Sequence, residues 1–272
     1  MILSEIFIYP VKSLRGIAVP LAKLEPRGLA YDRRWMIVAD GGNTFLTQRE
    51  FPTMALLHTE LTDQHLIIHH TTKSMESLRL PLNPAHYGEP IKVRVWDDVC
   101  EAALVSPAAD AWLSQALETP CQLVYMPDDS HRATDPKYST PEDIVSFADG
   151  FPILLIGQAS LNDLNKRLPE PIGIERFRPN LVFTGGEPYA EDNWKHFTIG
   201  TQTFRSVKPC ARCQLTTVNP ETGTFGREPL RTLSTYRLDG HKILFGMNVI
   251  WDATNGTKPF VKIGDPISVV NS

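Results

Sequence analysis

The chain has 272 residues, of which 42% are hydrophobic and 21% are charged, and it carries a formal net charge of -4 with a pI near 6.1. This length can bury a sizeable core in one large or two moderate domains, and the mildly acidic balance disfavours broad binding to nucleic acid or to an anionic membrane. The start of the chain lacks the pattern of a secretory signal, and no apolar run reaches the length of a membrane span. The four cysteines are few and irregularly spaced, so we expect a reducing cytoplasm, with neither a nucleic-acid nor a membrane partner.

Short strands dominate the predicted secondary structure. Runs rich in β-branched or aromatic residues and bounded by turn residues predict strands at 2–9, 34–38, 66–70, 91–95, 122–126, 181–184, 203–207, 215–218 and 267–270. One helix is expected after Ser106-Pro107, where a capping residue precedes proline, and another near Ser160, where leucines repeat at helical spacing. Regular alternation of strands and helices is absent, so the sequence predicts a mainly β fold, a β-barrel with appended helices.

A polar stretch at 127–136 resembles a solvated connection and predicts a boundary between two domains, 1–125 and 126–272. The segment that follows, 141–152, combines turn residues with aromatic residues, and it is either a loop over a site or a plain connector. Because binding residues are common on such loops, Ser146 and Asp149 are candidates for a functional role.

The motif Cys210-Ala211-Arg212-Cys213 is the leading candidate for chemistry. A thiolate is a soft ligand for a transition metal, and the neighbouring cations Arg212 and Lys208 favour ionisation of the Cys213 thiol. The alternative is a turn that buries two small apolar residues. The two cysteines are only half of a four-cysteine zinc pattern, and a thioredoxin-like motif would start a helix, whereas 214–218 predicts a strand.

Five segments that run nearly from one end of the chain to the other carry a family resemblance: Tyr9-Pro10-Val11-Lys12-Ser13, Asp32-Arg33-Arg34-Trp35, Ser146-Phe147-Ala148-Asp149-Gly150, Phe177-Arg178-Pro179-Asn180, and Cys210-Ala211-Arg212-Cys213 with Thr216-Thr217-Val218-Asn219-Pro220. In this order they resemble the MOSC family, named after the C-terminal domain of molybdenum cofactor sulfurase. Within it they are more similar to the bacterial YcbX proteins and the mitochondrial amidoxime-reducing component. Weaker agreement at Thr47-Gln48-Arg49 and Gly264-Asp265-Pro266 extends the resemblance.

The resemblance implies an N-terminal β-rich domain and a MOSC β-barrel domain, with a molybdenum cofactor (molybdopterin) held between them. It implies that Cys213 supplies the protein sulfur on molybdenum. Because only one protein thiolate is then required, we expect Cys210 to lie near the metal without binding it. Cations and neutral polar groups suit the phosphate and the pterin, and the residues implied are Lys12, Ser13, Arg33, Arg178, Asn180 and Arg212. Asp149 is the candidate proton donor, with a turn-forming aspartate as the alternative. Each cation also has the ordinary alternative of a solvated or ion-paired surface residue.

The reaction implied by the resemblance is a two-electron reduction of N-hydroxylated compounds by a molybdenum oxidoreductase. The sequence contains no dinucleotide fingerprint, no P-loop and no iron-sulfur cysteine quartet, so we expect electrons from a separate reductase or ferredoxin. Some longer members of the family carry a ferredoxin-like domain after the barrel, and this sequence ends at Ser272. The alternative hypothesis is a non-catalytic carrier of the molybdenum cofactor or of its sulfur, and a further alternative is an interaction module without metal.

Overall fold

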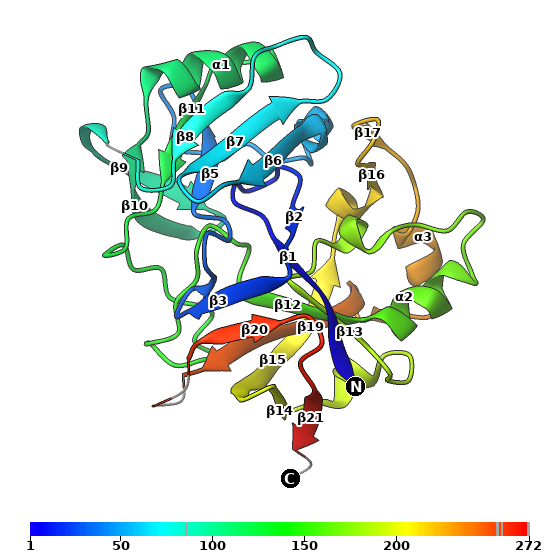
Figure 1. Ribbon diagram of the computed structural model, residues 1–272. Coiled ribbons are helices and arrows are strands. Elements are labelled where there is room, and N and C mark those ends of the chain that lie inside the picture. Colours follow the sequence, from blue (N-terminus) through cyan, green and yellow to red (C-terminus); the bar gives the residue numbers. More distant parts are fainter. Residues whose placement is uncertain (85, 254–255, 257, 271–272) are drawn as a thin grey trace.

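The computed structural model describes residues 1–84, 86–253, 256 and 258–270, which hold twenty-one strands and three α-helices. The mainly β prediction is therefore confirmed. Figure 1 shows one large sheet in the lower part of the molecule, with β3 and β20 of a smaller sheet beside it, and other small sheets, together with α1, in the upper part.

The large sheet joins both ends of the chain. Its nine strands have the order β2-β1-β13-β12-β19-β15-β14-β21, with β18 paired to β19. They are β1 (Ile2–Ile8), β2 (Ile17–Ala18), β12 (Ile153–Gly157), β13 (Leu181–Thr184), β14 (His196–Ile199), β15 (Gln202–Arg212), β18 (Leu238–Asp239), β19 (Lys242–Asp252) and β21 (Ile267–Val270). All described pairs are antiparallel except β12 with β13. Because β1 pairs with β13, the first residues of the chain belong to a sheet built mainly by its second half.

The smaller sheets have two to four strands each. One has the order β5-β11-β10-β9, formed by Trp35–Ala39, Cys121–Tyr125, Asp98–Leu104 and Tyr87–Val95. Another has the order β6-β7-β8, formed by Leu57–Leu61, His65–His70 and Leu78–Pro81. A third has the order β20-β3-β4, formed by Phe260–Lys262, Leu21–Glu25 and Gly28–Leu29, and β16 (Val218–Asn219) pairs with β17 (Thr224–Phe225). The division of the chain at 125 and 126 stays a prediction, and the β20-β3 pairing also crosses it.

The two predicted helices are confirmed as α1 (Pro107–Leu117) and α2 (Gln158–Asn165), and a short α3 covers Leu230–Leu233. The hydroxyl of Ser106 accepts a hydrogen bond from the Ala109 amide at 3.1 Å, which is the N-cap that the sequence predicts. Four 3-10 helices complete the described elements, at Pro52–Leu56, Ile174–Phe177, Ala190–Asn193 and Gln214–Thr217.

The predicted strand at 215–218 is wrong, because Gln214–Thr217 forms a 3-10 helix. The hydroxyls of Thr216 and Thr217 donate back to the carbonyl oxygens of Cys213 and Gln214, at 2.9 and 2.8 Å. Such local side-chain bonds favour a helical turn over a ladder, although threonine is a good strand former.

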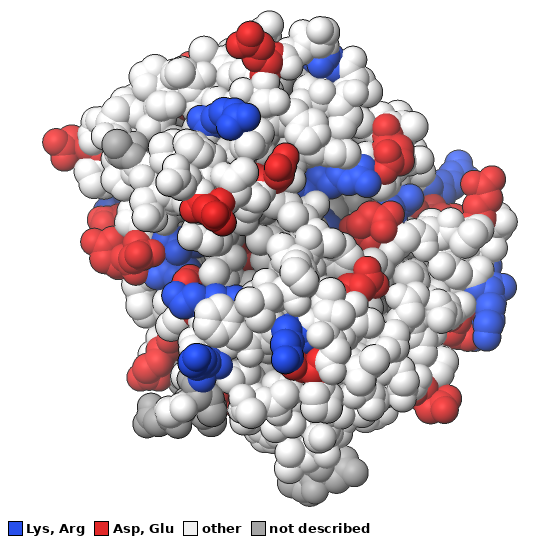
Figure 2. Space-filling view, viewed as in Figure 1, with Lys and Arg blue, Asp and Glu red and all other residues white. Residues whose placement is uncertain are grey.

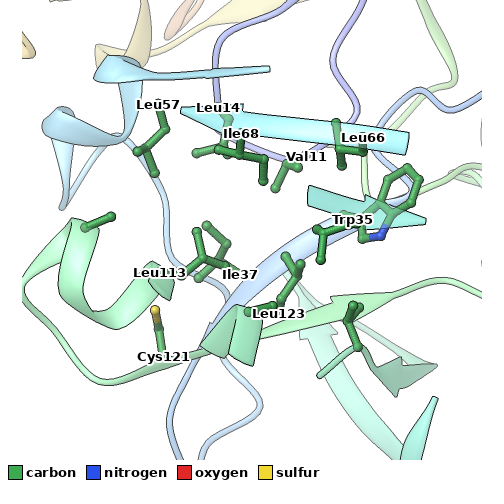
Figure 3. Packing of buried hydrophobic residues seen from close by; sticks show 14 of the residues in the cluster. Val11, Leu14, Trp35, Ile37, Leu57, Leu66, Ile68, Leu113, Cys121 and Leu123 are labelled. Carbon is green, nitrogen blue, oxygen red and sulfur yellow. The ribbon is translucent and has the colours of Figure 1, made fainter. Parts of the chain in front are cut away.

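Two hydrophobic cores are connected by the segment that contains Lys12 and Ser13. The upper core packs α1 against β5, β7 and β11, and Figure 3 shows Trp35, Ile37, Leu113 and Leu123 within it. The second core is built on the large sheet and includes Leu3, Ile6 and Ile8 of β1. Val11 and Leu14 belong to the upper core, so the chain passes from one core to the other between residues 8 and 11 and places Lys12 and Ser13 close to their junction.

The polar stretch at 127–136 is only partly the solvated connection that its composition predicts. Residues 128, 129, 131, 133, 135 and 136 are exposed, whereas Ser130, Arg132 and Thr134 are all less than one-tenth exposed. Arg132 is buried because its guanidinium satisfies three backbone carbonyl oxygens, so part of this polar sequence belongs to the interior.

The surface charge and the length of the helices are relevant to the expectation that neither nucleic acid nor a membrane is a partner. On the face shown in Figure 2, acidic and basic side chains are interspersed among the described residues, without an extended basic surface on that face. Among the described residues, no helix is both long and apolar enough to span a membrane. The cytoplasmic location stays a prediction.

Candidate functional site

A cavity of about 360 Å³ brings together all eight residues that the sequence predicts for the site. They are Lys12, Ser13, Arg33, Asp149, Arg178, Asn180, Arg212 and Cys213. Arg49, Trp96 and Cys210 also line this cavity. Lys208 and the fully buried Ser146 are not among its lining residues.

Backbone conformation is unusual around this cavity. Seven non-glycine residues of the described chain have a positive φ, and four of them line the cavity: Ser13 (68°), Arg33 (50°), Trp96 (57°) and Arg178 (55°). Residues other than glycine rarely adopt a positive φ, and those that do concentrate at functional sites. The packing around the cavity therefore fixes the direction of these four side chains at some cost in backbone free energy.

Tyr9 orders two of the cations. Its buried ring contacts the guanidinium groups of Arg33 and Arg178, which lie 4.1 and 4.3 Å from the ring centroid, and its hydroxyl donates to the carbonyl oxygen of Pro179 at 3.0 Å. The buried carboxylate of Asp32 accepts two bonds from Arg33, at 2.8 and 2.6 Å. Burial, reinforced by the nearby Arg33 charge, lowers the pKa of Arg178 to about 10, so the Arg178 guanidinium is still charged at neutral pH.

Lys12 and Asp149 form the polar floor of the cavity. The buried Lys12 ammonium donates to the Phe147 carbonyl oxygen at 2.7 Å and to the Asp149 carboxylate at 2.6 Å. Burial lowers the pKa of Lys12 to about 8, and Asp149 opposes that shift. The side chain of Asp149 is 59% exposed, so the loss of hydration raises its pKa only in part, and the charges of Lys12 and Arg49 outweigh this and hold the pKa below its usual range.

The predicted role of Asp149 as a proton donor stays a prediction. Its carboxylate accepts from Lys12, from the Trp96 indole at 3.2 Å and from Arg49 at 3.5 Å. Two nearby cations favour the ionised form of a carboxyl group. In the structure, Asp149 therefore anchors the groups around it.

The cation beside Cys213 comes from a distant part of the chain. Arg49 donates to the Cys213 sulfur at 3.1 Å, while its guanidinium lies 4.5 Å from the centroid of the Trp96 ring. Arg212, the sequence neighbour, donates to the Cys210 sulfur at 2.9 Å and to the Phe177 carbonyl oxygen at 2.7 Å. The expectation that Arg212 and Lys208 serve Cys213 is thus wrong, and Arg49 takes that place.

The sequence prediction missed Arg49, Trp96 and Arg132. The weak agreement at Thr47-Gln48-Arg49 was the only signal for the first of them. Trp96 stands in an ordinary turn sequence, and the composition around Arg132 indicated a solvated segment. Asn180, which was predicted, is engaged with protein groups: its side chain accepts from Arg33 at 3.2 Å and donates to the Phe7 carbonyl oxygen at 3.2 Å.

The donor set of the cavity suits an anionic ligand that carries a soft metal. Five lining residues are cations and one is a carboxylate; the cations are Lys12, Arg33, Arg49, Arg178 and Arg212. The buried Nε of Arg212 has no hydrogen-bond partner among the described residues, so a donor is left for a ligand. Within the described residues, no group of three or more His, Cys, Asp or Glu side chains could hold a metal ion by itself. Cys213 could therefore add one soft ligand to a metal that arrives with ligands of its own.

Comparison with known proteins agrees with this arrangement. The MOSC N-terminal beta barrel domain matches residues 1–120, and the MOSC domain matches residues 142–268. Mitochondrial amidoxime-reducing component 1 of Homo sapiens is 33% identical over 283 residues, which cover 97% of this chain and 81% of the relative. The chain belongs to the MOSC domain family.

Other MOSC relatives are much longer. Molybdenum cofactor sulfurase of Solanum lycopersicum is 32% identical over 289 residues, which cover 97% of this chain and 35% of the relative. The corresponding protein of Oryza sativa subsp. japonica is 34% identical over 264 residues, covering 90% of this chain and 32% of the relative. This chain therefore spans about a third of the length of these two relatives.

Proposed function

We propose that this MOSC protein binds a molybdenum cofactor in the described cavity and is an oxidoreductase for N-hydroxylated compounds. The observation that carries the proposal is the Cys213 thiol in a cavity lined by five cations, with Arg49 at 3.1 Å from the sulfur. The similarity to the amidoxime-reducing components over 97% of the chain supports the reaction class.

In this proposal, different residues of the cavity bind different parts of the cofactor. Arg33 and Arg178, both in contact with the Tyr9 ring, offer planar forks suited to a phosphate, and Lys12 adds a point charge. Cys213 would be the protein ligand to molybdenum, and the free Nε of Arg212 would donate to the pterin or to its phosphate. Arg49, which donates to the Cys213 sulfur at 3.1 Å, would offset the negative charge of a metal-bound thiolate.

When bound, the cofactor supplies two-electron redox chemistry at the metal, and the protein supplies orientation and electrostatics. The overall reaction breaks the N–O bond of the substrate. It consumes two electrons and two protons, and it yields the reduced nitrogen compound and one water. The electrons would come from a separate reductase or ferredoxin, which the chemistry requires and which is a second part of the proposal.

The decisive experiment compares the native chain with Cys213→Ser after production in a host that makes the cofactor. We expect near-stoichiometric molybdenum and pterin in the native protein and reduction of an amidoxime with dithionite as the electron donor. Cys213→Ser should lose turnover while keeping its melting temperature. Full activity of Cys213→Ser at full molybdenum content would refute the assignment.

A cofactor carrier is the second candidate, because the molybdenum cofactor sulfurases match the chain over almost its whole length. A carrier would use the same cavity and release its cofactor to an acceptor. Cofactor-loaded protein that activates a cofactor-free acceptor enzyme, and shows no turnover with dithionite, would favour the carrier over the reductase.

A further inference from the structure

Trp96 stands at the tip of a β-hairpin that borders the cavity. Val95 of β9 pairs with Asp98 of β10, so Trp96 and Asp97 form a two-residue turn. Trp96 has φ of 57°, the left-handed conformation that such hairpin turns need at their first central residue. The side chain is 42% exposed and lines the cavity.

Three contacts hold the indole in one orientation. Its Nε1 donates to the Asp149 carboxylate at 3.2 Å, the Arg49 guanidinium lies 4.5 Å from its ring centroid, and Phe45 meets it edge-on at 5.1 Å. Exposed aromatic side chains without such partners lose rotamer freedom when a ligand packs on them. The free-energy cost of ordering Trp96 is thus already met in the folded protein.

The hairpin tip is also fixed to the loop that carries Asp149. The carboxylate of Asp98 pairs with Arg132 at 2.8 Å, and Arg132 in turn donates to the carbonyl oxygens of Ala148 and Asp149 at 2.6 and 2.8 Å. The aromatic wall and the polar floor of the cavity therefore form one connected unit.

Trp96 is the aromatic surface that the cavity offers to a ligand. Three aromatic side chains line the cavity, but Phe151 and Phe177 are buried, at 7% and 0% exposure. We propose that the organic part of the substrate packs against the Trp96 indole, and that the site prefers N-hydroxylated compounds joined to a planar aromatic ring over small aliphatic ones. The identity of the reacting group rests on the function proposed above, whereas the packing against Trp96 does not.

The expected preference follows from ring stacking. Aromatic pairs contribute about 0.5–1.5 kcal/mol beyond the burial of area, which is about a 2- to 12-fold change in affinity at about 1.4 kcal/mol per tenfold. Replacing the indole by an aliphatic side chain of smaller size should lower the aromatic-over-aliphatic ratio by that factor. Replacing it by phenylalanine should keep most of the ratio, because a ring face remains.

The test measures benzamidoxime and acetamidoxime with cofactor-loaded protein. The native chain, Trp96→Leu and Trp96→Phe are compared, and Tyr31→Leu serves as the matched control, because Tyr31 is 37% exposed, has φ of 66° and does not line this cavity. Two ratios are recorded for each variant: kcat/KM of the two substrates, and their Kd by calorimetry without reductant. We expect both ratios to fall about 2- to 12-fold in Trp96→Leu alone, through KM and Kd of the aromatic compound.

The two proposals fail in different ways. A binding ratio that falls in Trp96→Leu, in a protein that never turns over either compound, supports the aromatic wall and sinks the reductase. Turnover with identical ratios in the native chain, Trp96→Leu and Trp96→Phe, at equal molybdenum content, supports the reductase and overturns the role of Trp96. An equal fall in the Tyr31→Leu control would also overturn it, because the effect would then be general.

Discussion

Arg132 is the buried group whose removal should do the most damage close to the site. It is 4% exposed, and its guanidinium donates to the carbonyl oxygens of Ser146, Ala148 and Asp149 at 2.8, 2.6 and 2.8 Å. It also donates to the Asp98 carboxylate at 2.9 Å. Arg132→Met keeps much of the side-chain volume and removes every one of these donors.

The expected loss in the free energy of unfolding comes mainly from the three carbonyl oxygens that lose their donor. The side chain of Asp98 is 49% exposed and regains water, so the lost ion pair contributes only about 0–1 kcal/mol. Each buried acceptor left without a donor costs about 1–3 kcal/mol. Partial access of water to three such acceptors gives a total loss of about 3–6 kcal/mol, which is about 6–24 °C in melting temperature for a chain of this size.

Thermal unfolding and sulfate binding by calorimetry test this reasoning together. Arg27→Met is the matched control, because Arg27 is also buried and donates to two carbonyl oxygens, those of Pro127 and Asp128, outside the cavity. Both variants should unfold at lower temperature, and only Arg132→Met should also weaken sulfate binding, since it frees the loop that carries Asp149. A melting temperature for Arg132→Met within about 2 °C of the native value would refute the argument.

Three further predictions concern other parts of the molecule. Burial lowers the pKa of Lys12 to about 8, so the ammonium loses its charge as pH rises through that value, and sulfate affinity should fall over the same range. Lys12→Arg should remove this pH dependence. A sulfate affinity of the native chain that does not change between about pH 7 and about pH 9.5 would contradict the prediction. Tyr9→Leu removes the ring that contacts the guanidiniums of Arg33 and Arg178, and it should lower the free energy of unfolding by about 3–5 kcal/mol in urea titration. A loss below about 1 kcal/mol would count against a stabilising contact between the ring and the two cations. Ser106→Ala removes the cap of α1 and should cost about 1 kcal/mol in the same titration, with unchanged sulfate affinity.

Local signals in the sequence predicted those elements whose causes are local. The cap at Ser106 and the proline that follows it depend on neighbouring residues alone, and α1 begins there. The strand runs follow from β-branched and aromatic residues that fit a half-buried sheet. The 3-10 helix at Gln214–Thr217 broke this pattern, because its threonine hydroxyls bond to their own backbone and not to a neighbouring strand.

The geometry around the cysteines could not be predicted in the same way. Alternation along a strand predicts which residues share a face, but β15 has irregular register against β19 between Ser206 and Lys208 and again between Pro209 and Ala211. Each irregularity turns the following side chains, so sequence spacing no longer says where Cys210 and Cys213 lie. The cation that meets Cys213 consequently comes from Arg49, 164 positions away.

Asp149 illustrates why a motif can identify a residue while its charge state depends on the fold. The family motif identified Asp149 as a site residue, but only its surroundings determine whether a carboxyl group there is protonated. Its neighbours are the ammonium of Lys12, the guanidinium of Arg49 and the indole N–H of Trp96, which come from three separate segments and all donate to it. A carboxylate that accepts from all three fixes their mutual positions, and these contacts are strongest while it is ionised. Asp149 therefore joins the cationic floor, the cation beside Cys213 and the aromatic wall into one site.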